Sequence, residues 1–393
     1  MTVAVDRDQA FLDDIATVAD DVAAVHASSV DREARFPAEA IDALRDRQAL
    51  SAALPTELGG GGVSFAAIAR GCFELGRRCG STAMVFAMHQ IKVNTIARHA
   101  EDSGWLAEYL QAVCAEQRLV ASVTTELGTG GDLGRSIAAL TPSADRTTCT
   151  FEKQAPVISY GAYADDIFVT LRRSPESEPN DQVVAIARAG QFTLEQTGNW
   201  DPLGMRGTCS PGFVVRAEVL PEQTLPSAFP RIMAESMLPI THILWSHLWL
   251  GIATDAFDRA RAFVRAAAKG SSGDAPPPAA VRLSHLMSEL SLLRAEVGSG
   301  LAEFVEISEE PGRERLLTMA STLRFNNLKI AASEQAPRVC QGAMGVCGIM
   351  GFKNDSPYSI GRHLRDTMSA SLMIANERIH QTNASLLLIA KDV

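Results

Sequence analysis

The sequence predicts an α+β fold in which a small β-barrel or sheet domain separates an N-terminal helical domain from a C-terminal four-helix bundle. Apolar residues recur at helical spacing near the N-terminus, as at Phe11, Ile15 and Val18. Short β-branched segments follow, and an apolar stripe over 283–301 again has helical spacing. We therefore expect three domains, at residues 1–118, 119–228 and 229–393.

Proline, serine and glycine residues set the expected helix boundaries in the first domain. Phe36-Pro37 opens a helix, because proline is well tolerated in a first helical turn. The glycine-rich segment 55–62 interrupts the helical pattern. Ser64 then caps a helix that runs to Leu75, and a longer helix follows over 81–99.

The expected strands are short, rich in β-branched and aromatic residues, and bounded by turn residues. They cover 147–151, 167–171, 183–186 and 213–215. A polar, proline-containing loop over 174–181 separates two of them. A small sheet or barrel is the expected result.

Bulk properties exclude several classes of function. The 393 residues have a net charge of −10, which disfavours nucleic-acid and anionic-membrane surfaces. Seven scattered cysteines form no C-x-x-C pair, so we expect free thiols in a reducing compartment and no metal site. The N-terminus lacks the apolar core of a signal peptide, and polar residues interrupt the apolar segment 237–253. These features predict a cytoplasmic protein.

Five motifs in order resemble those of the acyl-CoA dehydrogenase superfamily, whose members are flavoproteins with this α–β–α order. The central one is Thr125-Glu126-Leu127-Gly128-Thr129-Gly130-Gly131-Asp132, which is similar to the family's T-E-P-G-x-G-S-D. The others are the segment 54–62 after Phe36-Pro37, the segment 153–165, the pair 204–208 and 219–221, and the segment 340–348 with Arg365-Asp366.

The resemblance implies an FAD between the β domain and the C-terminal bundle. Glycines allow close approach to a diphosphate, and hydroxyls at Thr125 and Ser159 would bond the flavin ring edge. The implied cofactor-binding residues are Thr124, Thr125, Gly130, Gly131, Ile158, Ser159, Gln341, Gly345 and Asn376. The implied substrate pocket includes Gln90, His242, Trp245 and Ile374.

The family's reaction needs a carboxylate base, and neither usual position supplies one. Counting nine residues from Arg365 reaches Ile374, and the alternative position on the central helix falls at or near Thr241. A desolvated glutamate suits α-proton abstraction because burial raises its pKa. Glu377, one helical turn beyond Ile374, is the candidate base, and the competing interpretation is that Glu377 and Arg378 form a solvated helix face. Glu235 is a weaker candidate.

Other departures affect the adenine end of the cofactor site. Gly131 replaces the serine of G-S-D, and the family's R-x-x-F-G appears as Ala267-Ala268-Lys269-Gly270. The segment 353–358 adds an extra turn before Arg365. FAD binding is therefore expected in altered form.

Three functions remain open. The first is dehydrogenation of an acyl thioester, on CoA or an acyl carrier protein, with electrons passing to an electron-transfer flavoprotein or a reductase. The second is a flavin monooxygenase or hydroxylase that receives reduced flavin from a partner reductase and needs no such base. The third is a non-catalytic partner subunit. The apolar stripe over 283–301 and the family resemblance favour a homodimer or homotetramer.

Overall fold

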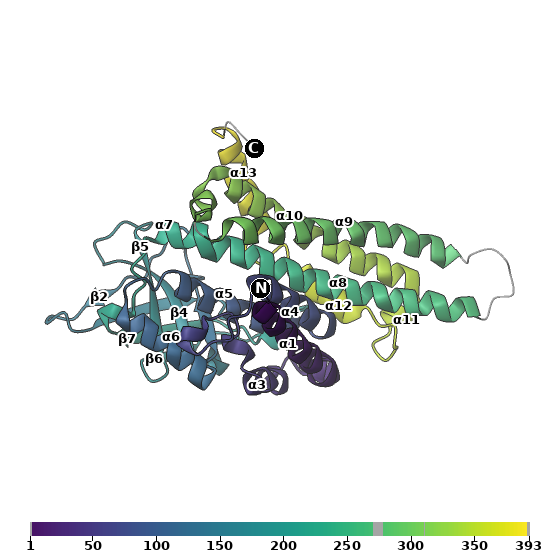
Figure 1. Cartoon of the computed structure of the whole chain (residues 1–393), viewed down its shortest axis with the longest axis horizontal. Coiled ribbons are helices and arrows are strands. Elements are labelled where there is room, and N and C mark those ends of the chain that lie inside the picture. The colour runs from purple at the N-terminus through teal and green to yellow at the C-terminus, as the bar shows by residue number, and fades with distance from the viewer. Residues whose placement is uncertain (1, 270–277, 310, 391–393) are drawn as a thin grey trace.

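The computed structural model describes residues 2–269, 278–309 and 311–390. Six helices form the N-terminal part, which lies below the long C-terminal helices in Figure 1. They are α1 (Thr2–Val18), α2 (Ala24–Glu33), α3 (Ala38–Asp46), α4 (Phe65–Arg78), α5 (Gly80–Arg98) and α6 (Gly104–Glu116). Ser64 caps α4 as expected, with its hydroxyl accepting from the Ala67 N–H at 3.2 Å.

The β region contains two separate sheets and no closed barrel among the described residues. Its strands are β1 (Val120–Val123), β2 (Thr141–Pro142), β3 (Cys149–Ala155), β4 (Asp166–Arg172), β5 (Gln182–Arg188), β6 (Phe192–Gln196) and β7 (Phe213–Val219). One sheet has the order β1-β4-β5, in which β1 and β4 are parallel, and the other has the antiparallel order β2-β3-β7-β6.

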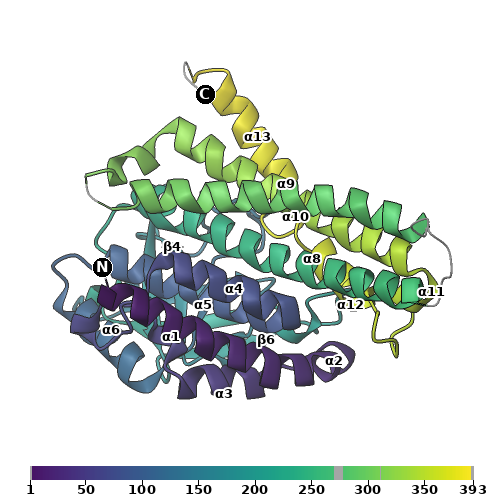
Figure 2. The ribbon, with the colours of Figure 1, turned by 45° about the vertical axis from the view of Figure 1, so that its right-hand side comes forward.

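Three long helices, α8, α9 and α10, lie side by side in both ribbon views (Figures 1 and 2). The C-terminal helices are α7 (Phe229–Ile232), α8 (Leu238–Lys269), α9 (Pro278–Ile307), α10 (Met319–Cys347), α11 (Ile349–Phe352), α12 (Gly361–Met368) and α13 (Asn376–Leu387). The predicted α–β–α fold class is confirmed. The predicted loop after Lys269 falls largely outside the described residues.

Helix α8 is the centre of the molecule because both the N-terminal helices and the bundle pack on it. Two glycines allow α4 and α8 to approach closely. A Cβ at Gly76 would lie 2.5 Å from the Leu248 oxygen, and one at Gly251 would lie 2.3 Å from the Phe73 oxygen.

The expected stripe on α9 is buried at Leu286, Leu290, Leu293 and Val297. Across the described residues, no helix has the length and apolarity needed to cross a bilayer.

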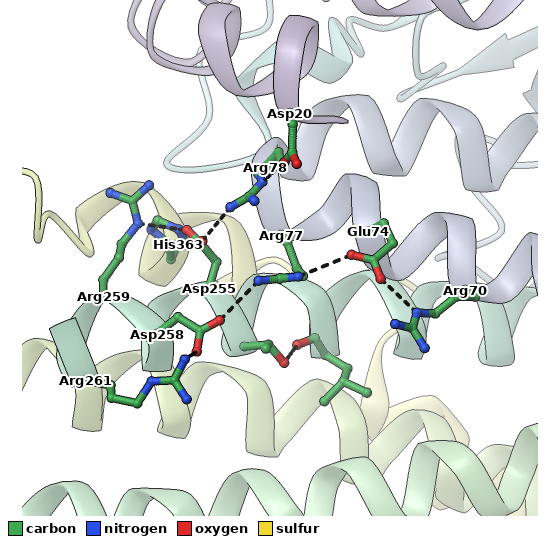
Figure 3. Close-up of polar contacts among 12 residues, drawn as sticks. Asp20, Arg70, Glu74, Arg77, Arg78, Asp255, Asp258, Arg259, Arg261 and His363 are labelled. Carbon is green, nitrogen blue, oxygen red and sulfur yellow. Dashed lines mark hydrogen bonds and ion pairs between the residues drawn. The ribbon is translucent and has the colours of Figure 1, made fainter. Parts of the chain in front are cut away.

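Salt bridges also join α4 to α8 (Figure 3). Arg77 pairs with Asp258 at 3.2 Å, and Arg78 pairs with Asp255 at 3.4 Å. Asp255 also accepts from His363 of α12 at 2.7 Å, so this buried carboxylate connects three helices. These contacts fix α12, which leads into the segment with the candidate site residues.

Candidate functional site

The segments 125–132 and 153–165, which are expected to contact flavin, are hydrogen-bonded to each other at the end of β1. The Thr125 hydroxyl donates to the Val157 carbonyl at 2.7 Å, and the Leu127 N–H donates to the Gln154 carbonyl at 2.9 Å. The Thr125 oxygen can still accept a hydrogen bond, but its proton is already used. The neighbouring Thr124 hydroxyl lies 3.3 Å from that of Ser122.

The glycine loop after Thr125 presents unpaired backbone donors. Gly128, Gly130 and Gly131 have φ of +91°, +61° and +85°, values that favour glycine. The Gly130 and Gly131 N–H groups find no acceptor within the described parts of the chain. Arg378 of α13 donates to the Gly130 carbonyl, so a guanidinium lies against the loop. Backbone N–H groups beside an arginine suit an anion.

A chain of hydroxyls leads to Ser159. Ser210 donates to the Ser159 oxygen at 2.9 Å, and Thr208 lies 2.8 Å from Ser210 on the other side. The Ser159 hydroxyl proton has no acceptor among the described residues, and the side chain is half-buried. Ile158 beside it is fully buried, and its N–H donates to Pro211. Ser159 can therefore donate a hydrogen bond to a ligand.

A buried lysine organises the turn that contains Ile374. The Lys329 ammonium of α10 donates to the Ile374 carbonyl and to Asn376 Oδ1, each at 2.7 Å. Asn376 also donates to Ser333 at 3.0 Å. Ile374 has a φ of +49°, which is rare and strained for a β-branched residue. Lys329 and Asn376 thus hold a strained backbone at Ile374, the position that the sequence resemblance assigns to the family's base.

Burial and charge keep the groups near this turn weakly basic. Burial lowers the pKa of Lys329 to about 7, although the Glu334 carboxylate opposes the shift. Burial, followed by the Lys329 charge, lowers the pKa of His242 to about 3. His242 Nδ1 lies 3.0 Å from the Phe325 carbonyl, which can only accept. Neutral His242 therefore has its proton on Nδ1, and its Nε2 is left as an acceptor.

The structure places the candidate base Glu377 on the exposed face of the first turn of α13. The Glu377 side chain forms no hydrogen bond or ion pair with Lys329 or Asn376 among the described residues, and it is exposed to solvent. The weaker candidate, Glu235, is buried but committed, with Arg231 and Arg313 each at 2.6 Å. The geometry does not support either carboxylate as the base.

The expected pocket residues have different surroundings. Gln90 donates to the Ala49 and Leu50 carbonyls, so its amide holds the chain near residue 50. Trp245 is 7% exposed, and its indole N–H has no partner among the described residues. Trp245 and His242 are close in sequence on α8, whereas Gln90 lies on α5.

Gln341 and Gly345 lie apart from the other expected cofactor residues. Both are exposed near the C-terminal end of α10. Helical rise puts Gly345 roughly 24 Å along α10 from Lys329. Gly345 is therefore remote from Asn376, which contacts Lys329.

Sequence reasoning missed Lys329, Arg378 and Ser210. A signal existed for Lys329, because Asn326, Lys329 and Ser333 share one helical face in an otherwise apolar segment. The contacts of Arg378 and Ser210 depend on segments distant in sequence, which no local pattern reports.

Comparison with known families identifies the chain. Residues 6–117 match the family model described as acyl-CoA dehydrogenase, N-terminal domain. The N-terminal part is therefore an acyl-CoA dehydrogenase N-terminal domain, and the chain as a whole is similar to members of the acyl-CoA dehydrogenase superfamily. Two relatives of the chain are the short-chain specific acyl-CoA dehydrogenase of Bos taurus and the L-evernosamine nitrososynthase of Micromonospora sp. The first is 23% identical over 349 residues (86% of this chain, 80% of the relative). The second is 25% identical over 374 residues (88% and 82%).

Solved structures share the whole fold of this chain at low identity. KijD3 in complex with dTDP has a TM-score of 0.83 at 20% identity, covering 97% of both chains. The dibenzothiophene monooxygenase TdsC of Paenibacillus sp. A11-2, with FMN bound, has a TM-score of 0.81 at 19% identity (96% of this chain, 97% of that one). Butyryl-CoA dehydrogenase of Megasphaera elsdenii has a TM-score of 0.81 at 20% identity, covering 98% of both. The superfamily's members are flavin oxidoreductases, and these structural neighbours include both dehydrogenases and a monooxygenase.

Proposed function

We propose that this protein is a flavin-dependent monooxygenase that receives reduced flavin and oxygenates an organic substrate. In this reaction one atom of O₂ enters the substrate and the other leaves as water, with two electrons from the reduced flavin. The single observation behind the proposal is the absence of a free buried carboxylate near Ile374 in the described part of the chain. Dehydrogenation requires such a base, whereas this oxygenation does not.

The buried carboxylates are already committed to other contacts. Glu126 accepts from Ser136 and from two backbone N–H groups, and Asp166 accepts a bidentate pair of bonds from Arg118 at 2.7 Å. Asp255 pairs with Arg78 and Arg259 and accepts from His363, and Asp366 accepts from the Met205 N–H at 2.7 Å. Freeing any of them would leave buried donors unpaired.

The residues at the end of β1 fit a flavin with a single phosphate. The free proton of Ser159 and the acceptor oxygen of Thr125 suit the polar edge of the ring. Gly130, Gly131 and Arg378 suit a phosphate. We expected FAD from the family resemblance, and we now propose FMN. KijD3 and TdsC have both been solved with FMN, which has the single phosphate that the glycine loop and Arg378 suit.

The chain's own groups would bind and orient the substrate on the bundle side. His242 Nε2 can accept a hydrogen bond from a substrate N–H or O–H, and the unpaired Trp245 indole N–H can donate one. Lys329 holds the Ile374 turn that would close this side against water. The proposed substrate is a nitrogen, sulfur or aromatic nucleophile, a class suggested by the names of the nitrososynthase and TdsC relatives.

The experiment supplies chemically reduced FMN under isotopically labelled O₂ and analyses products by mass spectrometry. Indole, dibenzothiophene and a dTDP-amino sugar serve as substrates, since the neighbouring structures name compounds of these kinds. We expect one labelled oxygen atom in a product, only when both O₂ and reduced FMN are present. Anaerobic conversion of an acyl-CoA to its enoyl product with an artificial electron acceptor would contradict the proposal.

We propose that the two boundaries between the three expected domains lie in the connections 117–119 and 220–228, where the element types change. A flavin reductase is the proposed electron donor. A homodimer is the proposed assembly, and light scattering of the purified protein tests it.

A further inference from the structure

A cavity of about 680 Å³ lies where α2, the 201–206 loop, α8, the 353–359 loop and α12 meet. Its volume is within the usual range for small-molecule pockets, roughly 300–1,000 Å³. Five arginines line it: Arg32, Arg206, Arg259, Arg362 and Arg365. Only two aspartates, Asp31 and Asp201, line it with them. This concentration of positive charge contrasts with a chain whose net charge is −10.

Three of the arginines are fixed by contacts in the cavity wall. Arg365 forms a bidentate pair with Asp31, with N–O distances of 2.8 and 2.5 Å. Arg206 Nε donates to the Asp31 carbonyl at 2.8 Å. Arg259 Nε donates to Asp255 at 2.8 Å, beside His363 (Figure 3). Fixed guanidinium groups lose little further entropy when they bind a ligand.

Three arginines of the cavity wall, Arg206, Arg259 and Arg362, have N–H groups without an acceptor among the described residues. Arg206 Nη2 and Arg259 Nη2 have no acceptor among the described residues. Arg362 donates to the Arg78 carbonyl through Nη2, while its buried Nη1 is unpartnered within the described chain. A buried unpaired donor costs free energy that an added acceptor would recover. The wall therefore has more donors than acceptors.

We propose that this cavity binds a small molecule that contains a diphosphate group. Free guanidinium donors approach from two sides, with Arg206 on the loop and Arg259 and Arg362 on the helices. Donors on two sides of the cavity can bind the two linked phosphates of a diphosphate, because each phosphate can accept bidentate hydrogen bonds from an arginine. Hydroxyls of Ser28, Ser356 and Ser359 and the Asn354 amide complete the lining and suit the polar remainder of the ligand. The acidic partners Asp31, Asp201 and Asp255 hold the arginines in place but do not use all their donors.

Calorimetric titration of the full-length protein with inorganic pyrophosphate tests the proposal, with sulfate at equal ionic strength as the competitor. We expect saturable pyrophosphate binding that sulfate does not match. Arg259→Gln and Arg362→Gln should each weaken binding about tenfold or more, because each removes a charged donor. Arg261→Gln is the matched control, since Arg261 lies on α8 but pairs with Asp258 and does not line the cavity.

A further variant separates weaker pyrophosphate binding from a loss of folding. Arg32 is 73% exposed at its side chain, so Arg32→Gln should leave the melting temperature unchanged and still weaken pyrophosphate binding. If the titration shows no saturable binding heat up to millimolar pyrophosphate, the proposal is overturned. The same holds if Arg261→Gln loses as much pyrophosphate affinity as the cavity variants. FMN titration of the same variants separates this site from the flavin site, and we expect unchanged FMN affinity. A parallel loss of FMN affinity would assign these arginines to the flavin and overturn the proposal.

Discussion

Replacement of Lys329 by methionine tests the arrangement of the candidate site through the pH dependence of stability. Methionine has a similar length and removes both the charge and the two 2.7 Å hydrogen bonds to Ile374 and Asn376. Lys329 is fully buried, and its pKa in the folded protein is about 7. An unfolded lysine has a pKa of about 10.4. The unfolded chain therefore binds more protons than the folded protein between these values.

This difference makes the wild-type protein more stable as the pH rises through that window, by up to about 1.4 kcal/mol per pH unit. From pH 7 to pH 9 the wild type should gain about 2 kcal/mol relative to Lys329→Met, because the variant has no such titration. Lost hydrogen bonds and relieved desolvation shift the variant's stability by a constant amount and do not affect this change.

Urea denaturation of both proteins at pH 7, 8 and 9 measures the effect, with the free energy of unfolding taken by linear extrapolation. Lys353→Met is the control, because that lysine is about half exposed on the 353–359 loop. Its difference from wild type should stay constant across the same pH range. A constant difference for Lys329→Met would refute the buried-lysine account.

Four further substitutions test other parts of the structure. Arg118→Met should lower the free energy of unfolding by about 3–5 kcal/mol, because Asp166 is left buried without its bidentate partner; a loss below about 1 kcal/mol in urea denaturation would contradict this. Ser159→Ala should weaken FMN binding about 2- to 12-fold in a fluorescence titration, the value of one hydrogen bond, and unchanged affinity would remove Ser159 from the site. Arg378→Gln should weaken FMN binding but leave riboflavin binding unchanged, since only FMN has a phosphate; equal losses would argue against a phosphate contact. Glu377→Gln should leave oxygen-dependent turnover unchanged, and loss of turnover would give Glu377 a catalytic role.

The α–β–α order and most elements could be predicted from the sequence because periodicity and caps are local signals. Ser64 at the start of α4 and the apolar stripe of α9 are examples. The division of the strands into two sheets could not be predicted, because β1 pairs in parallel with β4 across more than 40 residues. Such pairing depends on distant segments rather than on local pattern.

The candidate site also has residues that local motifs predict and residues that depend on tertiary packing. The glycine loop and Ser159 were predicted from motifs, and the structure ties their two segments together through Thr125. The exposure of Glu377 and the role of Lys329 were not predicted, since both depend on how α10 and α13 pack around the strained Ile374.

The most direct test of the proposed function is anaerobic mixing of the flavin-loaded protein with butyryl-CoA, followed by visible absorbance. A dehydrogenase would pass a hydride from the acyl chain to the flavin after its base removed the α-proton. Because the resemblance assigns the base position to Ile374, and no free buried carboxylate lies near it in the described residues, we predict an unchanged flavin spectrum. Rapid bleaching of the flavin would show that a base is present and would contradict the monooxygenase account.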